Sequence, residues 1–211
     1  MARLSEGPGS EERRSRAAER ECGSCSLCCT VLRVDELDKA AGRDCPHQRG
    51  EHGCGIYAKR PQICRGYECL WRQGGLEDDE RPDVTGGIVD LETVGVGLRL
   101  SIRVEGRGDF EKSQPLQAIA ERYRNEMPVR VSDAEDVMNP DRPFRVLMPA
   151  GVMHHVEGER IDVYQDGVHV ERSVLPWAER WARRLSIAWR NHGLHRSSIR
   201  RRRVAGKPES D

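Results

Sequence analysis

The sequence predicts an α+β fold, in which a small irregular cysteine-rich metal-binding module with short helices precedes an antiparallel β-meander packed by one or two helices. All eight cysteines of the chain lie between Cys22 and Cys69, a density typical of metal ligands. Strict alternation of apolar and polar residues from Val94 to Val104 indicates a half-buried strand. Apolar residues at helical spacing over 116–123 and 177–189 indicate two helices.

The content of hydrophobic residues is low for a chain that has to form its own core. Of 211 residues, 36% are hydrophobic and 33% are charged, and chains this polar commonly need a metal, a disulfide or a partner protein. The net charge of zero gives the whole chain no bias towards nucleic acid or a membrane. However, the segment from Arg180 to Lys207 holds ten Arg or Lys and no acid. We interpret it as a solvated basic tail, with a nucleic acid or another polyanion as the less favoured partner.

The thiols are expected to be reduced. No apolar run reaches the length of a membrane span, and residues 1–21 contain no apolar region of a signal peptide. We therefore expect a cytoplasmic protein without a membrane partner. Reducing conditions there favour metal binding over disulfides, although an even cysteine count would also suit a secreted disulfide framework.

Four segments are expected along the chain. Residues 1–20 form a disordered or loosely helical N-terminus, and residues 21–90 form the cysteine-cluster metal-binding module. Residues 91–192 form an α+β region with antiparallel strands and a Trp-rich helix, and residues 193–211 form a basic disordered tail.

Within the module, two short helices are predicted. The first covers Val34–Gly42, with Asp35 as its N-cap and Gly42 just past its end. The second opens at Pro61 and carries Cys64. The acidic run at 77–80 is predicted to be a solvated loop, because calcium loops space their acids at alternate positions.

The second half begins with the strand or hairpin that ends at Val104, followed by a turn at 106–109. A helix capped by Ser113 comes next, with strands at 144–148 and 152–156 and a hairpin over 161–170 that turns at Asp166-Gly167. The final helix opens near Pro176 and aligns Trp177, Trp181, Leu185 and Trp189. We expect this stripe to be buried against the sheet.

The cysteine pattern points to soft-metal chemistry, because thiolates select zinc, copper(I) and iron–sulfur clusters. Adjacent Cys28 and Cys29 diverge in direction, so we expect them to serve different centres, or one of them to be a reactive or supporting thiol. Eight thiols would satisfy two four-thiolate centres, either two zincs or two clusters. The predicted ligands are Cys22, Cys25, Cys28, Cys29, Cys45, Cys54, Cys64 and Cys69.

The spacing favours iron slightly. Zinc ribbons show two C-x-x-C pairs, whereas here only the first half of the module has one. The run Cys22-x-x-Cys25-x-x-Cys28 with a distant Cys45-Pro46 is similar to ferredoxin ligation. His47 and His52 are alternative ligands in place of a thiol, although an ordinary loop role is favoured for each. The rings of His154 and His155 point to opposite faces of a strand and cannot chelate as a pair.

These motifs carry a resemblance to a known family. Cys22-x-x-Cys25-x-x-Cys28-Cys29 resembles the signature of the zinc- or iron-chelating CxxCxxCC domain family, the YkgJ-like cysteine-cluster proteins. The continuation is also similar, with Cys45-Pro46, Gly53–Tyr57 and Arg60-Pro61-x-x-Cys64-Arg65-x-Tyr67-x-Cys69, so the resemblance covers about residues 20–90. It implies chelation of zinc or iron. Some relatives of the domain are associated with protein lysine methylation, which adds an enzymatic alternative.

That alternative, a lysine methyltransferase-like or redox enzyme using the metal centre, has no motif of its own. Gly95 and Gly97 offer a glycine pair, but the residues after them alternate as a strand instead of opening a nucleotide-binding helix. Eight clustered thiols also allow no single nucleophile to be named, so catalytic residues stay unassigned.

Overall fold

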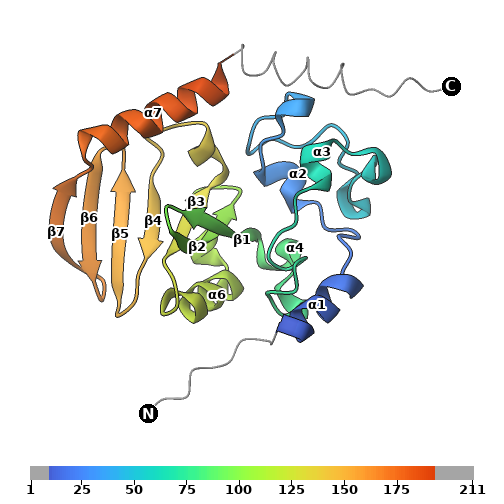
Figure 1. Ribbon diagram of the computed structural model, residues 1–211, viewed down its shortest axis with the longest axis horizontal. Helices are drawn as coiled ribbons and strands as arrows, with labels where there is room; N and C mark the ends of the chain where they lie inside the picture. Colours follow the sequence, from blue (N-terminus) through green and yellow to red (C-terminus); the bar gives the residue numbers. More distant parts are fainter. Residues whose placement is uncertain (1–9, 193–211) are drawn as a thin grey trace.

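The computed structural model describes residues 10–192, which form an α+β fold with the cysteine-rich part beside a seven-stranded sheet (Figure 1). The helical elements of the first part are α1 (Ser10–Glu19), α2 (Leu27–Val31), η1 (Asp35–Leu37), η2 (Gly50–His52), η3 (Tyr57–Lys59), α3 (Gln62–Arg65), η4 (Asp78–Glu80) and α4 (Pro82–Thr85). The strands are β1 (Gly87–Val94), β2 (Gly97–Val104), β3 (Val129–Asp133), β4 (Phe144–Leu147), β5 (Val152–Glu157), β6 (Arg160–Gln165) and β7 (Val168–Val174). Between and after them lie α5 (Asp109–Lys112), α6 (Gln114–Arg124), η5 (Ala134–Val137) and α7 (Trp177–Asn191).

The strands follow one another across the sheet from β1 to β7, and one pair breaks the predicted antiparallel meander. β2 and β3 run parallel, because α5 and α6 carry the chain back over the sheet before β3 begins. The single strand predicted over Val94–Val104 is in fact the last residue of β1, a turn, and the whole of β2. Gly95 adopts a φ of +59°, which reverses the chain, and Val94 pairs with Gly97 across the turn.

Several local predictions are confirmed. β4 and β5 occupy the expected ranges, and Asp166 and Gly167, at φ +50° and +81°, turn the chain between β6 and β7. Ser113 caps α6 by accepting a hydrogen bond of 3.3 Å from the amide of Leu116.

The predicted helix over Val34–Gly42 is wrong. Only the single 3₁₀ turn η1 forms, and Asp38 takes a left-handed φ of +56° so that Lys39 bridges back to Val34. Lys39 is buried, and its ammonium donates to the carbonyl oxygen of Thr30 at 2.7 Å and to that of Leu32. Satisfying this buried charge outweighs the helical pattern.

One continuous core joins the two parts of the molecule. Leu70, Trp71 and Leu76, which follow the last cysteine, are buried together with apolar residues of β2, β3 and α6. A second cluster places Val31 of α2 against Ile88 of β1 and Ala134 of η5. β1 itself runs across the expected boundary at residue 90, so the cysteine-rich part is packed directly on the sheet.

Residues 10–19 of the N-terminus, which is expected to be disordered or loosely helical, form α1, and this helix packs on the loop after Trp71. A Cβ atom added to Gly74 would lie 2.2 Å from the carbonyl oxygen of Arg13, so the two backbones are in direct contact. Arg20 is buried and donates a 2.6 Å hydrogen bond to the carbonyl oxygen of Trp71. Residues 1–9 and the basic tail predicted over 193–211 lie outside the described residues.

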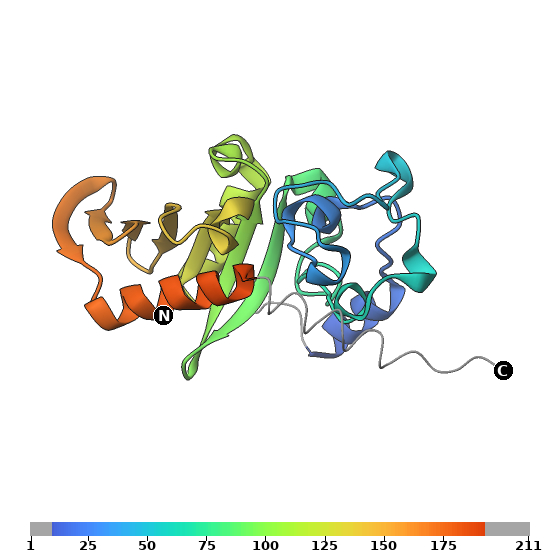
Figure 2. The ribbon, with the colours of Figure 1, turned by 90° about the horizontal axis from the view of Figure 1, so that it is seen from above.

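The predicted burial of the tryptophan stripe on α7 is wrong. α7 and α6 lie on opposite sides of the sheet (Figure 2), but Trp177, Trp181 and Trp189 are 71%, 58% and 61% exposed. The helix faces the sheet with Ile187, which is buried, and with its arginines. Arg180, Arg183 and Arg184 pair with the carboxylates of Glu159, Asp136 and Asp141. Because these pairs hold the arginine side of the helix against the body, the tryptophans on the opposite side face outwards.

No helix within residues 10–192 is both long enough and apolar enough to cross a membrane.

Candidate metal centre

The structure brings all eight predicted cysteines to the wall of one cavity of about 420 Å³. Every one of them is a free thiol. The cavity lies between α2, α3 and the loops around them, and β1 contributes Ile88 to its wall. Residues that are up to 47 positions apart in the sequence, from Cys22 to Cys69, therefore share one space.

The first four thiols are placed by a turn and a short helix. Gly23 has a φ of +54°, and the amide of Cys25 donates a 2.9 Å hydrogen bond to the carbonyl oxygen of Cys22. α2 then begins at Leu27 and carries Cys28 and Cys29 in its first turn. A turn of this kind directs the thiols at its two ends to the same side, as in known C-x-x-C metal knuckles.

Cys45 and Cys54 are brought to the first four thiols by backbone contacts. The amide of Cys45 donates a 3.1 Å hydrogen bond to the carbonyl oxygen of Cys29. Cys54 lies in a short bridge with Gln48, and the preceding Gly53 approaches Gly23 so closely that an added Cβ atom would lie 2.4 Å from its carbonyl oxygen. Only glycine fits where these two cysteine loops meet.

The last two cysteines are held by α3 and the sheet. Cys64 lies in α3, after the predicted opening at Pro61. Cys69 is followed by Leu70, whose amide donates a 2.7 Å hydrogen bond to the carbonyl oxygen of Val89 in β1. The sheet thus fixes the position of the last thiol.

Electrostatic coupling links Cys69 with the first knuckle. Burial raises the pKa of the Cys69 thiol to about 11, and the charges of Cys25 and Cys22 add to the rise. Burial likewise raises the pKa of Cys25, with a contribution from Cys22. The pKa of Cys28 is raised first by a hydrogen bond with Cys29 and then by burial, and Cys22 and Cys25 also contribute. Cys22, Cys25, Cys28 and Cys69 are therefore electrostatic neighbours.

The other four thiols interact with one another in the same way. Burial raises the pKa of Cys64 to about 11, and three thiols add to the rise, those of Cys29, Cys45 and Cys54. Burial also raises the pKa of Cys45, with further contributions from Cys29 and Cys54. The thiols of Cys29 and Cys54 are close enough for a hydrogen bond. The eight thiols thus fall into two sets of four, and these sets meet at Cys28 and Cys29.

Cationic side chains surround the second set. The hydrogen bond with Cys28 and the charges of Lys39 and Arg60 together lower the pKa of Cys29 to about 7, against the effect of burial. The guanidinium of Arg60 also stacks on the ring of Tyr57, at 3.8 Å from its centroid. Arg60 and Arg103 both line the cavity, and the Nε atom of each is buried without a hydrogen-bond partner among the described residues. These cations place positive charge beside the thiols of the cavity.

The sequence did not single out the pair formed by Tyr67 and Asp90. The hydroxyl of Tyr67, on the cavity wall, donates to the two carboxylate oxygens of Asp90 in β1, at 2.8 and 3.0 Å. Burial, together with the charge of Asp90, raises the pKa of Tyr67 far above its usual value, and burial raises that of Asp90. The available signal was the place of Tyr67 inside the cysteine motif, two positions before Cys69.

The sequence offers His47 and His52 as alternative ligands, with a loop role favoured for each, and the backbone of His47 forms a hydrogen bond with the Cys45 thiol. Neither His47 nor His52 lies on the wall of the cysteine cavity. His154 and His155 are neighbours in β5, far along the chain from the cysteines, and successive residues of a strand face opposite sides of the sheet. Among the described residues that line this cavity, the eight thiols outnumber the two carboxylates, those of Asp35 and Glu68.

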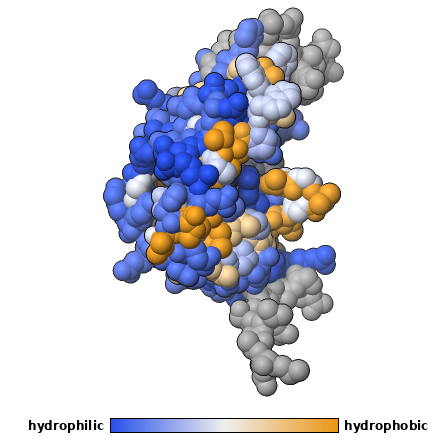
Figure 3. Space-filling model, turned by 90° about the vertical axis from the view of Figure 1, so that its left-hand side faces the viewer, coloured by the Kyte–Doolittle hydropathy of each residue, from blue (hydrophilic) through white to orange (hydrophobic). Residues whose placement is uncertain are grey.

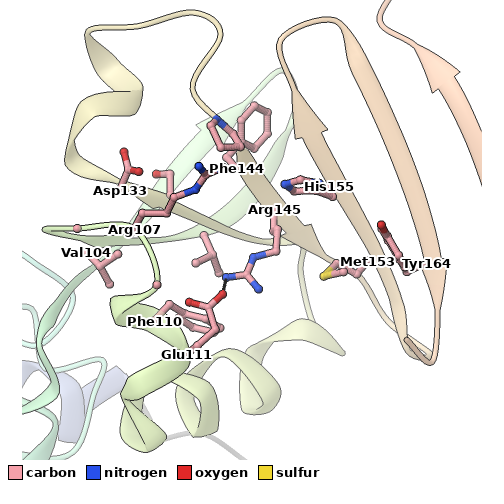
Figure 4. Close-up of a pocket in the computed structure, with 15 residues that line it drawn as sticks. Val104, Arg107, Phe110, Glu111, Asp133, Phe144, Arg145, Met153, His155 and Tyr164 are labelled. Atoms are coloured by element: carbon pink, nitrogen blue, oxygen red, sulfur yellow. Dashed lines mark hydrogen bonds and ion pairs between the residues drawn. The ribbon is translucent and has the colours of Figure 1, made fainter. Parts of the chain in front are cut away.

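A second cavity, of about 320 Å³, lies between α5 and strands β3 to β6 (Figure 4). Glu111 and Arg145 form an ion pair across it, and Asp133 is paired with Arg142 at 2.7 Å. Phe110, Phe144 and Tyr164 contribute aromatic rings to its wall. No cysteine lines this cavity, and its carboxylates already have cationic partners, so the thiol chemistry is confined to the first cavity.

Among residues 10–192, no group of three or more cysteine, histidine, aspartate or glutamate side chains has the arrangement of a finished metal site. The thiols line one cavity and form two sets of electrostatic neighbours, but no three of the described thiols are arranged around one metal position. Comparisons of the chain with protein-family models, with curated proteins and with solved structures find no match.

Proposed function

We propose that this chain binds zinc or iron at two four-thiolate centres. The first uses Cys22, Cys25, Cys28 and Cys69, and the second uses Cys29, Cys45, Cys54 and Cys64. The observation that carries the proposal is that all eight thiols of the chain line one cavity as free cysteines. The resemblance of residues 20–90 to the CxxCxxCC family supports the same conclusion, and we propose membership of that family with it.

The division into two centres follows from local geometry. Cys28 and Cys29 are consecutive in α2, so their side chains leave the helix about 100° apart and suit different centres. The largest influence on the pKa of each is their mutual hydrogen bond, and beyond it Cys28 is affected by Cys22 and Cys25 whereas Cys29 is affected by Cys54. Zinc and iron–sulfur clusters both accept four thiolates, so the donor set fits either metal.

Metal binding would stabilise the loops that carry the thiols. The loops around Cys45 and Cys54 contain little regular structure, and metal ligation contributes folding free energy in small modules of this kind. Lys39 and Arg60 lie close enough to Cys29 to offset part of the negative charge of a four-thiolate centre. We assign the chain a chelating or structural role in a reducing, cytoplasmic environment, in which thiols remain available to metals.

An enzymatic use of the centres is a second proposal, favoured by the size and lining of the cavity. Beyond the thiols, its wall includes Ile56, Ile63, Ile88 and Val137 together with Arg103, so an apolar lobe with a cation adjoins the sulfur atoms. Apolar cavities with a few polar groups are the usual form of small-molecule sites. An iron–sulfur centre would supply redox chemistry next to this lobe, whereas zinc would supply Lewis acidity only if one ligand position opened.

The test is anaerobic purification followed by elemental analysis and an absorbance spectrum. We expect two metal centres per chain, which would be colourless with zinc and brown with iron–sulfur clusters. Pairs of substitutions then test the assignment. Cys22→Ser with Cys69→Ser removes two ligands of one centre and should remove one centre, whereas Cys64→Ser with Cys69→Ser should remove both. A protein free of metal would refute the function, and equal losses in the two double variants would refute the division.

A further inference from the structure

The outer face of α7 carries an apolar stripe that is largely exposed to solvent. Trp177, Trp181, Leu185 and Trp189 recur every four residues and are 71%, 58%, 62% and 61% exposed. Isolated exposed apolar residues are common on proteins, but a continuous row of three tryptophans and a leucine is not. Such a row marks a surface that meets another apolar phase.

The inner face of α7 explains why the stripe points outwards. Arg183 pairs with Asp136 at 3.0 Å, Arg184 pairs with Asp141 at 3.0 Å, and Arg180 pairs with Glu159. The guanidinium of Arg183 also lies 4.8 Å from the ring centroid of Phe144. The helix is therefore attached to the body through its charged face, the reverse of an ordinary amphipathic helix on a globular core. This arrangement fixes the tryptophans on the outside.

A second apolar feature projects on the same side of the molecule. The β1–β2 hairpin extends beyond the sheet on the side where α7 lies (Figure 2). Near its turn, Val94, Val96 and Leu98 are exposed, and Val96 is as accessible as an isolated residue. Seen from the β7 end, hydrophobic residues form separate patches and a projection on a largely hydrophilic surface (Figure 3). Two separate apolar elements on one side suit a broad surface better than a single partner helix.

The charge of the chain indicates the nature of that surface. From Arg190 to Lys207 the sequence contains seven Arg or Lys and no Asp or Glu. A basic segment that directly continues a tryptophan-rich amphipathic helix is the combination by which peripheral proteins bind anionic lipid. Tryptophan also favours the interface between lipid headgroups and acyl chains, because its ring is apolar and its N–H is polar.

We propose that α7 and the tip of the β1–β2 hairpin bind the surface of an anionic phospholipid bilayer. The helix lies in the plane of the interface, with its tryptophans among the lipid headgroups and its arginine face still on the protein. The proposal departs from the sequence-based expectation of no membrane partner, and it is independent of the metal centres. Binding of this kind requires no membrane-spanning helix.

The experiment uses intact protein and phosphatidylcholine vesicles with or without phosphatidylserine. Three of the four tryptophans lie in the stripe and the fourth, Trp71, is buried, so a shift in tryptophan fluorescence reports on α7. We expect a blue shift and co-sedimentation with the anionic vesicles, and loss of both at high salt. The double variant Trp181→Ser with Trp189→Ser should bind at least about tenfold more weakly.

The matched control is Val84→Ser, which changes an exposed apolar residue of α4 and should leave binding unchanged. Circular dichroism checks that each variant is folded, as substitutions of exposed residues should allow. Equal binding of the tryptophan variant and the original chain would overturn the proposal, because the basic segment alone would then account for it. A dimer in light scattering that the tryptophan variant disperses, without any binding to vesicles, would instead assign the stripe to a second copy.

Discussion

Ile88→Ala is the substitution that most directly tests whether the sheet supports the cysteine cavity. Ile88 lies in β1, is 1% exposed, and belongs to the buried cluster that contains Val31 and Ala134. Cys28 and Cys69, both assigned to the first centre, pack against this cluster, and Ile88 itself lines the cavity. Its side chain therefore links the sheet to the thiols.

The expected cost follows from the atoms removed. Isoleucine to alanine deletes three carbon atoms, worth about 0.8 kcal/mol each in transfer free energy, and the space left behind adds to this. We expect a loss of about 3–4 kcal/mol in the free energy of unfolding. For a chain of this size, that loss lowers Tm by roughly 10 °C. We also expect metal to be lost from the first centre before the second.

The assay combines urea unfolding, followed by circular dichroism, with elemental analysis. Leu116→Ala is the matched control, because Leu116 is equally buried in the core but does not line the cavity. It should cost a similar free energy and retain its metal. A loss below about 1 kcal/mol for Ile88→Ala, or equal metal loss in the two variants, would refute the idea that Ile88 supports the thiols.

Three further outcomes are expected. Tyr67→Phe removes the hydroxyl that donates to the half-buried carboxylate of Asp90 and should cost about 1–3 kcal/mol, measured as a shift in the urea midpoint. Gly53→Ala places a Cβ atom 2.4 Å from the carbonyl oxygen of Gly23 and should lower Tm and metal content, whereas Gly50→Ala, at a similar positive φ but with open space, should do less; equal effects would contradict the contact. Burial opposes the charge of Glu92, but a hydrogen bond from Arg99 and the charges of Arg103 and Arg99 outweigh it and lower its pKa. Its stabilising contribution is therefore complete above the unfolded pKa of about 4.3 and is lost as pH falls through the lower folded value; acid unfolding curves of Glu92→Gln should lack this part of the pH dependence.

The features that local chemistry determines could be predicted from the sequence. The clustering of the cysteines, the Asp166-Gly167 turn and the Ser113 cap each depend on a few neighbouring residues, and the fold class follows from the order of these elements. Strand β3 escaped prediction because Val129–Asp133 is short and mixes apolar with charged residues, so its place in the sheet depends on parallel pairing with β2.

The orientation of α7 could not be predicted for a different reason. Helical spacing shows that an apolar stripe exists, but the side that faces the body is chosen by partners elsewhere in the chain. Arg183 finds Asp136 across 47 residues, and no local pattern announces this pair. The division of the thiols into two sets could not be predicted for the same reason. Cys69 lies near Cys22 and Cys25 only because the chain folds back and the residue after Cys69 bonds to β1.

The shared core has a consequence for how this protein can be divided. Leu70, Trp71 and Leu76 follow the last cysteine immediately, and they are buried against strands and a helix of the second half. A fragment cut out at residue 86 would carry every thiol but would expose these three side chains and lose Ile88. The cysteine segment therefore depends on the sheet for its fold. A fragment or chimaera that carries the eight thiols has to include at least strand β1.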